Sequence, residues 1–379
     1  MFSVIFNLMN MNPFDTDHSR RAFVQKMTLG ALALPFLKLG DKPFSSDKKL
    51  RIALVGLGRY ALKLADGIEK SQFCQLTGIV TGTPAKAVEW SKKYNLPSSS
   101  VYNYETFDHI ADNKDIDVIY IVLPNGMHKE YAIRAAKAGK HVIVEKPLAT
   151  NAADCMDIIK ACEKYGAKLA VGYRLHYEPY NMEMMRLGQQ KIYGKVRLVE
   201  SELGYNMTNM DPADWHFNKK LSGGGSLQNL GVYCVQAARY ILGEEPTSVT
   251  AYFGPNSKPE LFKEVEESVH WKLEFPSGAI AHSTCSAGYP LDRLFASAEH
   301  NTFELNPAIS YGPFRGWTRD GEFKFPVTHM QQVQLDEMAK VLLAGKEFPM
   351  HVSGWEGYKD LKVMDAIYKS AEQGKQVMI

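Results

Sequence analysis

Short apolar runs and amphipathic stretches alternate along the first half of the chain. The apolar runs have the length and composition of buried strands and lie at 50–55, 75–80, 116–123 and 141–145. The stretch 127–138 has the helical spacing of apolar residues and ends at Gly139. Strands and helices that alternate in this way predict a parallel βαβ sheet.

Beyond Gly172 the pattern changes to a region rich in strands. Four runs with strand composition lie at 196–203, 249–253, 269–275 and 279–287. They predict a second domain built on a mostly antiparallel, open sheet. We therefore expect an α/β protein with an N-terminal Rossmann dinucleotide-binding domain over 47–172 and a C-terminal α+β domain over 173–379. Helices expected at 328–344 and 354–374 are predicted to pack back on the first domain.

A glycine-rich turn follows the first predicted strand. The sequence at 56–61 is G-x-G-x-x-A between a strand and a helix. Gly56 permits the tight turn, Gly58 lets the backbone approach a pyrophosphate, and Ala61 allows the helix to pack closely on the strand. The helix N-terminus then faces the phosphates. The predicted nucleotide contacts of this turn are Gly56, Leu57, Gly58, Arg59 and Tyr60.

The end of the second predicted strand indicates which dinucleotide binds. In NAD enzymes an acidic residue about 20 positions after the glycines binds the ribose 2′-hydroxyl. This chain instead reads Val80-Thr81-Gly82-Thr83, and Lys86 follows shortly after. Because hydroxyls and an ammonium group suit a 2′-phosphate, Thr81 and Lys86 favour NADP over NAD. A Lys86 that merely solvates a helix face is the alternative.

Two polar segments, 124–128 and 145–147, directly follow predicted strands of the first half. Ligands of open α/β sheets bind at the carboxyl ends of the strands. Lys146 is therefore expected at the reacting centre. The further nucleotide contacts predicted from these segments are Pro124, Asn125, His128, Glu145 and Lys146.

A glycine-led helix in the second domain carries the other candidate residues. It is predicted over 227–242, ends at Gly243, and places Asn229 and Tyr233 on one face because they are four residues apart. Removing a hydride from a carbinol requires a base for the hydroxyl proton, and a tyrosine serves when a nearby cation lowers its pKa from about 10. We expect Lys146 to meet Tyr233 for this purpose, with Asn229 holding a substrate hydroxyl. A Tyr233 that only packs in the core is the alternative.

The segment ahead of the first strand has the pattern of a twin-arginine export signal. Ser-Arg-Arg-Ala-Phe-Val-Gln-Lys at 19–26 precedes an apolar stretch at 27–39. That stretch is too short and too weakly apolar for a stable membrane span, which needs about 20 apolar residues. We expect 1–46 to be an export leader and linker and the protein to be periplasmic, although no clear cleavage motif precedes Asp47. An amphipathic arm is the alternative.

Charge and cysteine content narrow the class of partner. The 44 basic and 42 acidic residues are spread along the chain and give a net charge of +2, so no basic stripe points to nucleic acid. The five cysteines have no metal-ligand spacing, so we expect buried thiols and no metal site. A small molecule is the expected partner.

Several longer motifs in register carry a resemblance to a known family. They lie at 56–61, 120–128 (YIVLPNGMH), 138–147 (AGKHVIVEKP), 172–177 (GYRLHY) and 223–246. Together they resemble the Gfo/Idh/MocA oxidoreductases, and within that family the glucose-fructose oxidoreductase branch.

The resemblance implies that Lys146 and Tyr233 are the catalytic pair, with Tyr233 as the general base. Asn229 stands where the family usually has an aspartate, so it can hydrogen-bond but carries no charge. The resemblance also implies a cis peptide bond between Lys146 and Pro147. It further implies that the cofactor and substrate cleft is lined by Arg174, Tyr177 and Trp215.

These observations together predict an exported sugar oxidoreductase with a tightly bound NADP. Because no free NADP is expected outside the cytoplasm, such an enzyme would oxidise an aldose and return the hydride to a ketose without releasing the nucleotide. Two other functions fit the same motifs: a glycosidase that oxidises its sugar transiently with bound NAD(P), and a non-catalytic NADP- and sugar-binding protein. A homodimer or homotetramer is expected.

Overall fold

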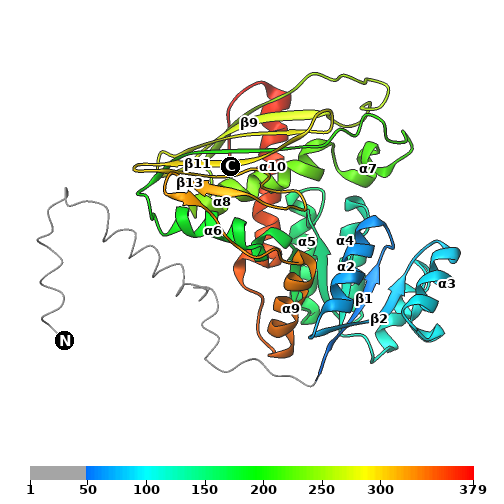
Figure 1. Cartoon of the computed structure of the whole chain (residues 1–379). Helices are drawn as coiled ribbons and strands as arrows, with labels where there is room; N and C mark the ends of the chain where they lie inside the picture. The colour runs from blue at the N-terminus through cyan, green and yellow to red at the C-terminus, as the bar shows by residue number, and fades with distance from the viewer. Residues whose placement is uncertain (1–47) are drawn as a thin grey trace, which may run out of the picture. The chain divides into compact units, whose positions relative to one another are not determined.

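The computed structural model describes residues 48–379 (Figure 1). The export leader predicted over 1–46 lies outside the described residues. Among the helices of 48–379, none is both long and apolar enough to cross a bilayer. All five cysteines are buried with free thiols, as the sequence predicts.

Six parallel strands form the first sheet, in the order β3-β2-β1-β4-β5-β6. Their bounds are β1 Leu50–Val55, β2 Cys74–Val80, β3 Val101–Tyr102, β4 Val118–Ile121, β5 His141–Glu145 and β6 Leu169–Gly172. Every residue of β4 is buried because helices pack on the sheet, which is why such strands appear as continuous apolar runs. This is the Rossmann order, in which ligands bind where the strand order reverses, between β1 and β4. The predicted fold class is confirmed for this half.

Helices from both ends of the described chain cover this sheet. The connecting helices are α2 Arg59–Lys70, α3 Pro84–Lys93, α4 His128–Lys137 and α5 Ala152–Tyr165. Near the C-terminus, α9 (Met330–Leu343) packs against α2, and α10 (Gly354–Gln373) packs against α5. Ser71 donates a hydrogen bond to Asp336 of α9, and the Ala152 N–H donates one to Asp365 of α10 at 2.9 Å. The end of the chain is thus tied to the nucleotide-binding half.

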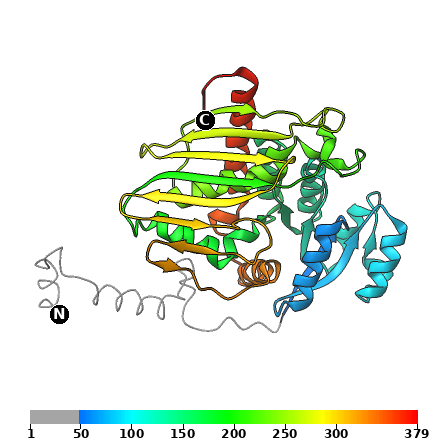
Figure 2. The same cartoon turned by 45° about the horizontal axis from the view of Figure 1, so that its top comes forward.

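The second sheet has nine strands in the order β14-β13-β12-β11-β7-β10-β9-β8-β15. Figure 2 looks onto its broad face, with α10 behind it. The bounds are β7 Val196–Gly204, β8 Ser248–Phe253, β9 Ser268–Glu274, β10 Ile280–Ser286, β11 Leu291–Ala298, β12 Thr302–Leu305, β13 Gly316–Thr318, β14 Gly321–Glu322 and β15 Val377–Met378. Its pairs are antiparallel except β7 with β10, which confirms the predicted mostly antiparallel sheet.

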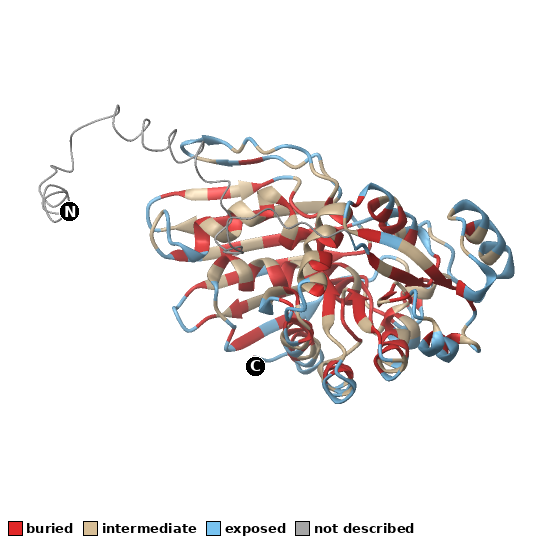
Figure 3. Ribbon diagram, turned by 90° about the horizontal axis from the view of Figure 1, so that it is seen from below, coloured by how far each residue is buried: buried red, intermediate tan, exposed pale blue. Residues whose placement is uncertain are grey.

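Two helices, α6 (Pro179–Gln189) and α8 (Val232–Leu242), pack on each other, and α8 also packs on β7. The short α7 (Lys219–Ser222) lies between them in the chain, directly before the glycines at 223–225. One continuous hydrophobic core includes residues of both sheets, such as Leu54 and Val199. Figure 3 shows the buried residues concentrated in the strands and on the inner faces of the helices. The two halves therefore share their core, which fixes the site between them.

Candidate active site

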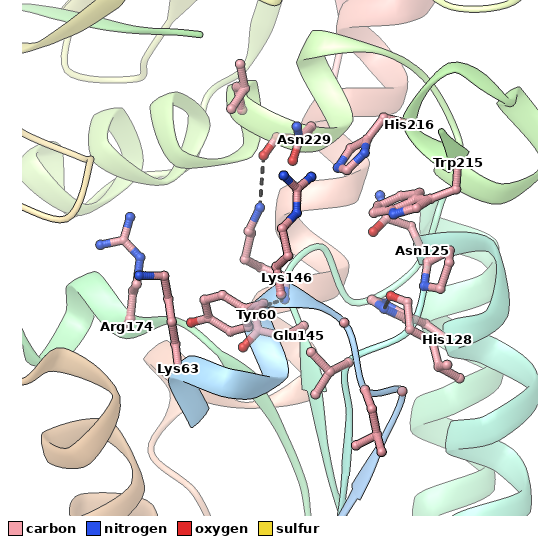
Figure 4. A pocket seen from close by; sticks show the side chains of 18 of the residues that line it. Tyr60, Lys63, Asn125, His128, Glu145, Lys146, Arg174, Trp215, His216 and Asn229 are labelled. Carbon is pink, nitrogen blue, oxygen red and sulfur yellow. Dashed lines mark hydrogen bonds between the residues drawn. The ribbon is translucent and has the colours of Figure 1, made fainter. Parts of the chain in front are cut away.

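A cavity of about 740 Å³ lies where the carboxyl ends of β1, β4 and β5 meet the second half of the chain (Figure 4). Its size is typical of a ligand or cofactor site. The residues predicted from sequence that line it are Gly56, Leu57, Gly58, Arg59, Tyr60, Thr81, Lys86, Pro124, Asn125, His128, Glu145, Lys146, Arg174, Trp215, Asn229 and Tyr233. The structure therefore brings residues from distant parts of the sequence to one place.

Tyr177 does not line this cavity, contrary to the prediction. It ends the 3-10 turn η5 (Arg174–Tyr177), which leads directly into α6. The Tyr177 ring packs on the hydrophobic core and lies 6.4 Å from the ring of His351, measured between centroids. Tyr177 therefore packs against the core, while Arg174 at the start of the same turn lines the cavity.

The glycine turn has the geometry that a dinucleotide requires. Gly56 has φ +92°, and a Cβ there would lie 2.7 Å from the Val122 carbonyl oxygen. A Cβ on Gly58 would meet no protein atom within 4 Å, so its backbone faces open space. No side chain caps the N-terminus of α2 at Gly58, which leaves its N–H groups available to an anion. These residues fit a pyrophosphate.

The Thr81 corner of the cavity carries hydroxyls and one ammonium group. Thr81 is buried and accepts a hydrogen bond from the Thr83 N–H at 3.2 Å. Lys86 Nζ donates to the Leu57 carbonyl oxygen at 2.9 Å, so its side chain lies against the glycine turn. Among the described residues that line the cavity, Glu145 is the single acidic one. The Thr81 corner therefore offers a cation and hydroxyls rather than a carboxylate.

Lys146 and Tyr233 meet across the cavity. The Lys146 ammonium lies 4.7 Å from the centroid of the Tyr233 ring. It also donates a hydrogen bond to the Asn229 carbonyl oxygen at 2.9 Å (Figure 4). The peptide bond between Lys146 and Pro147 is cis, as expected. Asn229 thus contacts Lys146 through its backbone, while its side-chain amide faces Met207.

The helix that carries Tyr233 begins with a wide turn. Leu227–Gly231 form one π-helical turn before α8 starts at Val232. The Glu266 carboxylate accepts hydrogen bonds from the N–H groups of Gly225 at 2.8 Å and Leu227 at 2.9 Å. A Cβ on Gly225 would lie 1.9 Å from the Glu266 carbonyl oxygen, so only glycine fits there. The glycine run therefore allows the backbone approach that sets the position of Tyr233.

Arg174 supplies a second cation next to Tyr233. Its guanidinium carbon lies 5.2 Å from the Tyr233 ring centroid and 4.6 Å from that of Tyr311. Burial alone would lower the pKa of Arg174, but the neighbouring tyrosines outweigh this and raise it. Arg174 donates to the carbonyl oxygens of Ser310 at 3.0 Å and of Ile309. It is a fixed, charged wall of the cavity.

Glu145 lies directly behind Lys146. Its carboxyl accepts hydrogen bonds from the Tyr120 hydroxyl at 2.7 Å and from the Lys146 N–H at 3.2 Å. Burial raises its pKa to about 7, despite the opposing effect of these hydrogen bonds and of the Lys146 charge. The charge on Glu145 therefore changes near neutral pH, next to the candidate catalytic lysine.

Two predicted residues connect the cavity walls. The ring nitrogens of His128 lie 2.9 Å from the Pro147 carbonyl oxygen and 2.8 Å from that of Leu123. The Asn125 amide donates to the Ser222 carbonyl oxygen at 2.8 Å. His128 thus joins the two loops that follow β4 and β5, and Asn125 joins the first of these loops to the glycine-rich segment.

Several residues that line the cavity were not predicted from the sequence. They include Lys63, Thr83, Tyr104, Leu203, Tyr205, His216, Ile309 and Tyr311. His216 stacks on Trp215 with 3.8 Å between ring centroids, and its Nδ1 lies 2.5 Å from the Asp214 carboxylate. The Asp-x-His spacing beside Trp215 was an available signal for His216. Tyr311 lies in an irregular loop, where no periodicity marks it.

The Rossmann sheet, the open glycine turn and the Lys146–Tyr233 pair define a dinucleotide-dependent oxidoreductase. Residues 50–173 match the model of the oxidoreductase family with an NAD-binding Rossmann fold, and 182–306 match the Gfo/Idh/MocA C-terminal domain. The chain belongs to the Gfo/Idh/MocA oxidoreductase family, which confirms the resemblance found in its motifs.

Individual relatives differ in how closely they match. The crystal structure of aldose-aldose oxidoreductase from Caulobacter crescentus, complexed with glycerol, is 37% identical, with a TM-score of 0.84 over 88% of this chain and 100% of that chain. D-xylose 1-dehydrogenase [NADP(+)] of Haloarcula marismortui is 24% identical over 88% of this chain and 94% of its own length. Inositol 2-dehydrogenase of Rhizobium meliloti is 26% identical over 87% of this chain and 99% of its own length.

Proposed function

We propose that this protein is an NADP-dependent sugar oxidoreductase that passes a hydride between a sugar and a tightly bound nicotinamide. The observation that carries the proposal is that two cations, Lys146 and Arg174, lie beside the Tyr233 ring in the cavity. Cations beside a phenol stabilise its phenolate, and a phenolate accepts the proton of a carbinol. The names of the aldose-aldose oxidoreductase and of the xylose dehydrogenase support a sugar as the substrate.

The chain's own residues handle the proton. Tyr233 takes the hydroxyl proton as the carbinol C–H bond breaks, and a ring-form aldose leaves as its lactone. In the second half of the cycle Tyr233 returns that proton to the oxygen of the sugar being reduced. When bound, the nicotinamide accepts and later returns the hydride. Lys146 supports the charge that develops on the phenol oxygen and on the sugar oxygen.

The preference for NADP rests on the Thr81 corner of the cavity. The side chains of Thr81, Thr83 and Lys86 suit a phosphate on the adenosine ribose, whereas no described acidic side chain lines that corner for a free 2′-hydroxyl. Two xylose dehydrogenases among the relatives carry NADP(+) in their names. We therefore assign NADP as the nucleotide of this protein.

The closed cycle follows from the proposed export. An enzyme that leaves the cytoplasm through the twin-arginine route carries its nucleotide with it and regenerates it in place. Oxidation of an aldose followed by reduction of a second sugar achieves this without exchange of nucleotide. A ketose is the acceptor we propose, and the name of the aldose-aldose oxidoreductase indicates that a second aldose is the acceptor to compare with it.

Absorbance of reduced nicotinamide tests the proposal directly. The protein is purified without added nucleotide, mixed with glucose, and followed in the near ultraviolet before fructose or a second aldose is added. Absorbance that rises with the first sugar and falls with the second supports the closed cycle. Turnover that requires added NADP contradicts nucleotide retention, and no reduction by any aldose contradicts the proposed function. Release of bound nucleotide by denaturation and its separation identify NADP or NAD.

A further inference from the structure

The loop that carries Tyr311 is held unusually firmly for an irregular segment. It lies between β12 and β13, and the three residues before Tyr311 are fixed from two sides. The Asp292 carboxylate accepts hydrogen bonds from the N–H groups of Ala308 at 2.8 Å, Ile309 at 2.6 Å and Ser310 at 3.1 Å. Arg174 binds the carbonyl oxygens of Ile309 and Ser310. The backbone that presents Tyr311 is therefore rigid.

The Tyr311 ring itself lies against two cations. Lys63 Nζ of α2 is 4.1 Å from the ring centroid, and the Arg174 guanidinium carbon is 4.6 Å from it. Each such contact is favourable, at about 0.5–2 kcal/mol. Tyr311 is nevertheless 44% exposed, and among the described residues its hydroxyl has no hydrogen-bond partner. A half-exposed phenol fixed by both halves of the chain presents a hydroxyl in a defined position.

Arg174 carries an unused donor at the same place. The residue is 2% exposed, and its Nε has no hydrogen-bond partner in the described structure. An unpaired buried donor costs free energy, so native proteins usually satisfy it with a ligand or water. Arg174 lines the cavity beside Tyr233 and Tyr311, but its Nε is itself enclosed by protein atoms, so the half-exposed Tyr311 hydroxyl is the group that a ligand in the cavity can contact.

We propose that the Tyr311 hydroxyl forms a subsite that recognises a hydroxyl group of the sugar other than the one that reacts. The inference rests on the proposed function and names a residue that orients the sugar against Tyr233. A phenol hydroxyl both donates and accepts hydrogen bonds. It therefore suits a polyhydroxylated ring, whose hydroxyls supply both acceptors and donors. Tyr311 is thus a specificity-determining residue.

The variant Tyr311→Phe isolates the hydroxyl. It keeps the ring, both cation contacts and the loop hydrogen bonds, so the fold is preserved. Tyr165→Phe is the matched control, because Tyr165 is 39% exposed, has Lys164 Nζ 5.4 Å from its ring centroid, and does not line the cavity. The rate of reduction of the bound nucleotide is measured against sugar concentration with glucose and with its 2-, 3-, 4- and 6-deoxy analogues.

Loss of one neutral hydrogen bond is expected to raise the half-saturating glucose concentration of Tyr311→Phe about 3- to 10-fold, with the limiting rate within about twofold of the wild type. With the one analogue that lacks the contacted hydroxyl, Tyr311→Phe and the wild type are expected to have equal half-saturating concentrations. Tyr165→Phe is expected to match the wild type with every sugar.

Other outcomes overturn the inference. An unchanged half-saturating concentration with glucose shows that the Tyr311 hydroxyl binds no sugar hydroxyl. An equal loss with glucose and all deoxy analogues shows a general structural role. If wild-type protein is reduced by the sugars, either result refutes the subsite while the proposed function stands. If no aldose reduces the wild-type nucleotide, the proposed function fails and the subsite fails with it.

Discussion

Replacing Glu145 by glutamine removes a buried titratable group from the wall behind Lys146. The glutamine has nearly the same shape, and its oxygen can still accept the hydrogen bond of the Tyr120 hydroxyl. Burial raises the pKa of Glu145 from 4.5 to about 7 in the folded chain. At about 1.4 kcal/mol for each tenfold change in proton affinity, this corresponds to about 3 kcal/mol.

The direction in which the free energy of unfolding changes with pH follows from whether Glu145 holds a proton in the folded and in the unfolded chain. Below pH 4.5 the carboxyl is protonated in both the folded and the unfolded chain. Between pH 4.5 and about 7 the unfolded chain loses the proton while the folded chain keeps it, so this group makes the free energy of unfolding fall as pH rises. In Glu145→Gln no carboxyl titrates at this position, so this decrease in the free energy of unfolding is absent. Relative to the wild type, the variant is therefore expected to gain about 2–3 kcal/mol of stability between pH 5 and pH 8.

Urea unfolding of both proteins at pH 5, 6, 7 and 8 measures the effect. At each pH the free energy of unfolding of the wild type is subtracted from that of the variant, and these differences are then compared between pH values. Any change in packing or hydrogen bonding caused by the substitution is independent of pH and cancels. The two proteins are compared at equal nucleotide content, because a bound ligand also stabilises the folded chain. A stability difference that stays constant from pH 5 to pH 8 would refute the assignment of a raised pKa to Glu145.

The other predictions concern the reaction, the nucleotide and the glycine-rich segments. Tyr233→Phe is expected to slow reduction of the bound nucleotide by about 10²–10⁴-fold, with the nucleotide content unchanged, as rapid-mixing absorbance can show; an unchanged rate excludes Tyr233 as the base. Lys86→Met is expected to weaken NADP binding about 10–100-fold and leave NAD binding unchanged in titrations of nucleotide-free protein; an equal loss for both would contradict a 2′-phosphate contact. Gly58→Ala is expected to abolish nucleotide binding while keeping the melting temperature of the nucleotide-free wild type, since its Cβ meets only open space in the protein. Gly225→Ala is expected to lower the free energy of unfolding by about 1–3 kcal/mol, because its Cβ would clash with the Glu266 carbonyl oxygen; calorimetry on the two glycine variants checks this contrast.

The first half of the chain was the most predictable part. Its central strand β4 is buried at every residue, so it appears as the uninterrupted apolar run 118–121. The glycine turn at 56–61 and Lys146 could be placed as well, because both follow such strands at the carboxyl edge of the sheet. In this half of the chain, short stretches of sequence are enough to predict the strands, and the sheet topology then places the glycine turn and Lys146.

The strands from β11 to β15 of the second sheet were not predicted. In β11 the sequence Leu-Asp-Arg-Leu-Phe-Ala-Ser-Ala buries only Leu294 and Ala296, and its charged residues pair across strands, as Arg293 does with Glu200 and Glu304. Such a strand has no clean apolar alternation. Leu291 of β11 pairs with Gly204 of β7, which lies 87 residues earlier in the chain, so periodicity along the chain cannot reveal this pairing.

The sequence alone determined the Rossmann half, the glycine turn, the mostly antiparallel second sheet and the pair Lys146 and Tyr233, because these depend on local backbone preferences and on motifs in short windows. Only the tertiary structure decided that Arg174 lies beside both Tyr233 and Tyr311, that Tyr177 of the same turn packs against the core instead of lining the cavity, and that Glu145 is buried beside Lys146. Contacts of this kind arise from the packing of elements far apart in the chain. The direction of each side chain is set by that packing rather than by its neighbours in sequence.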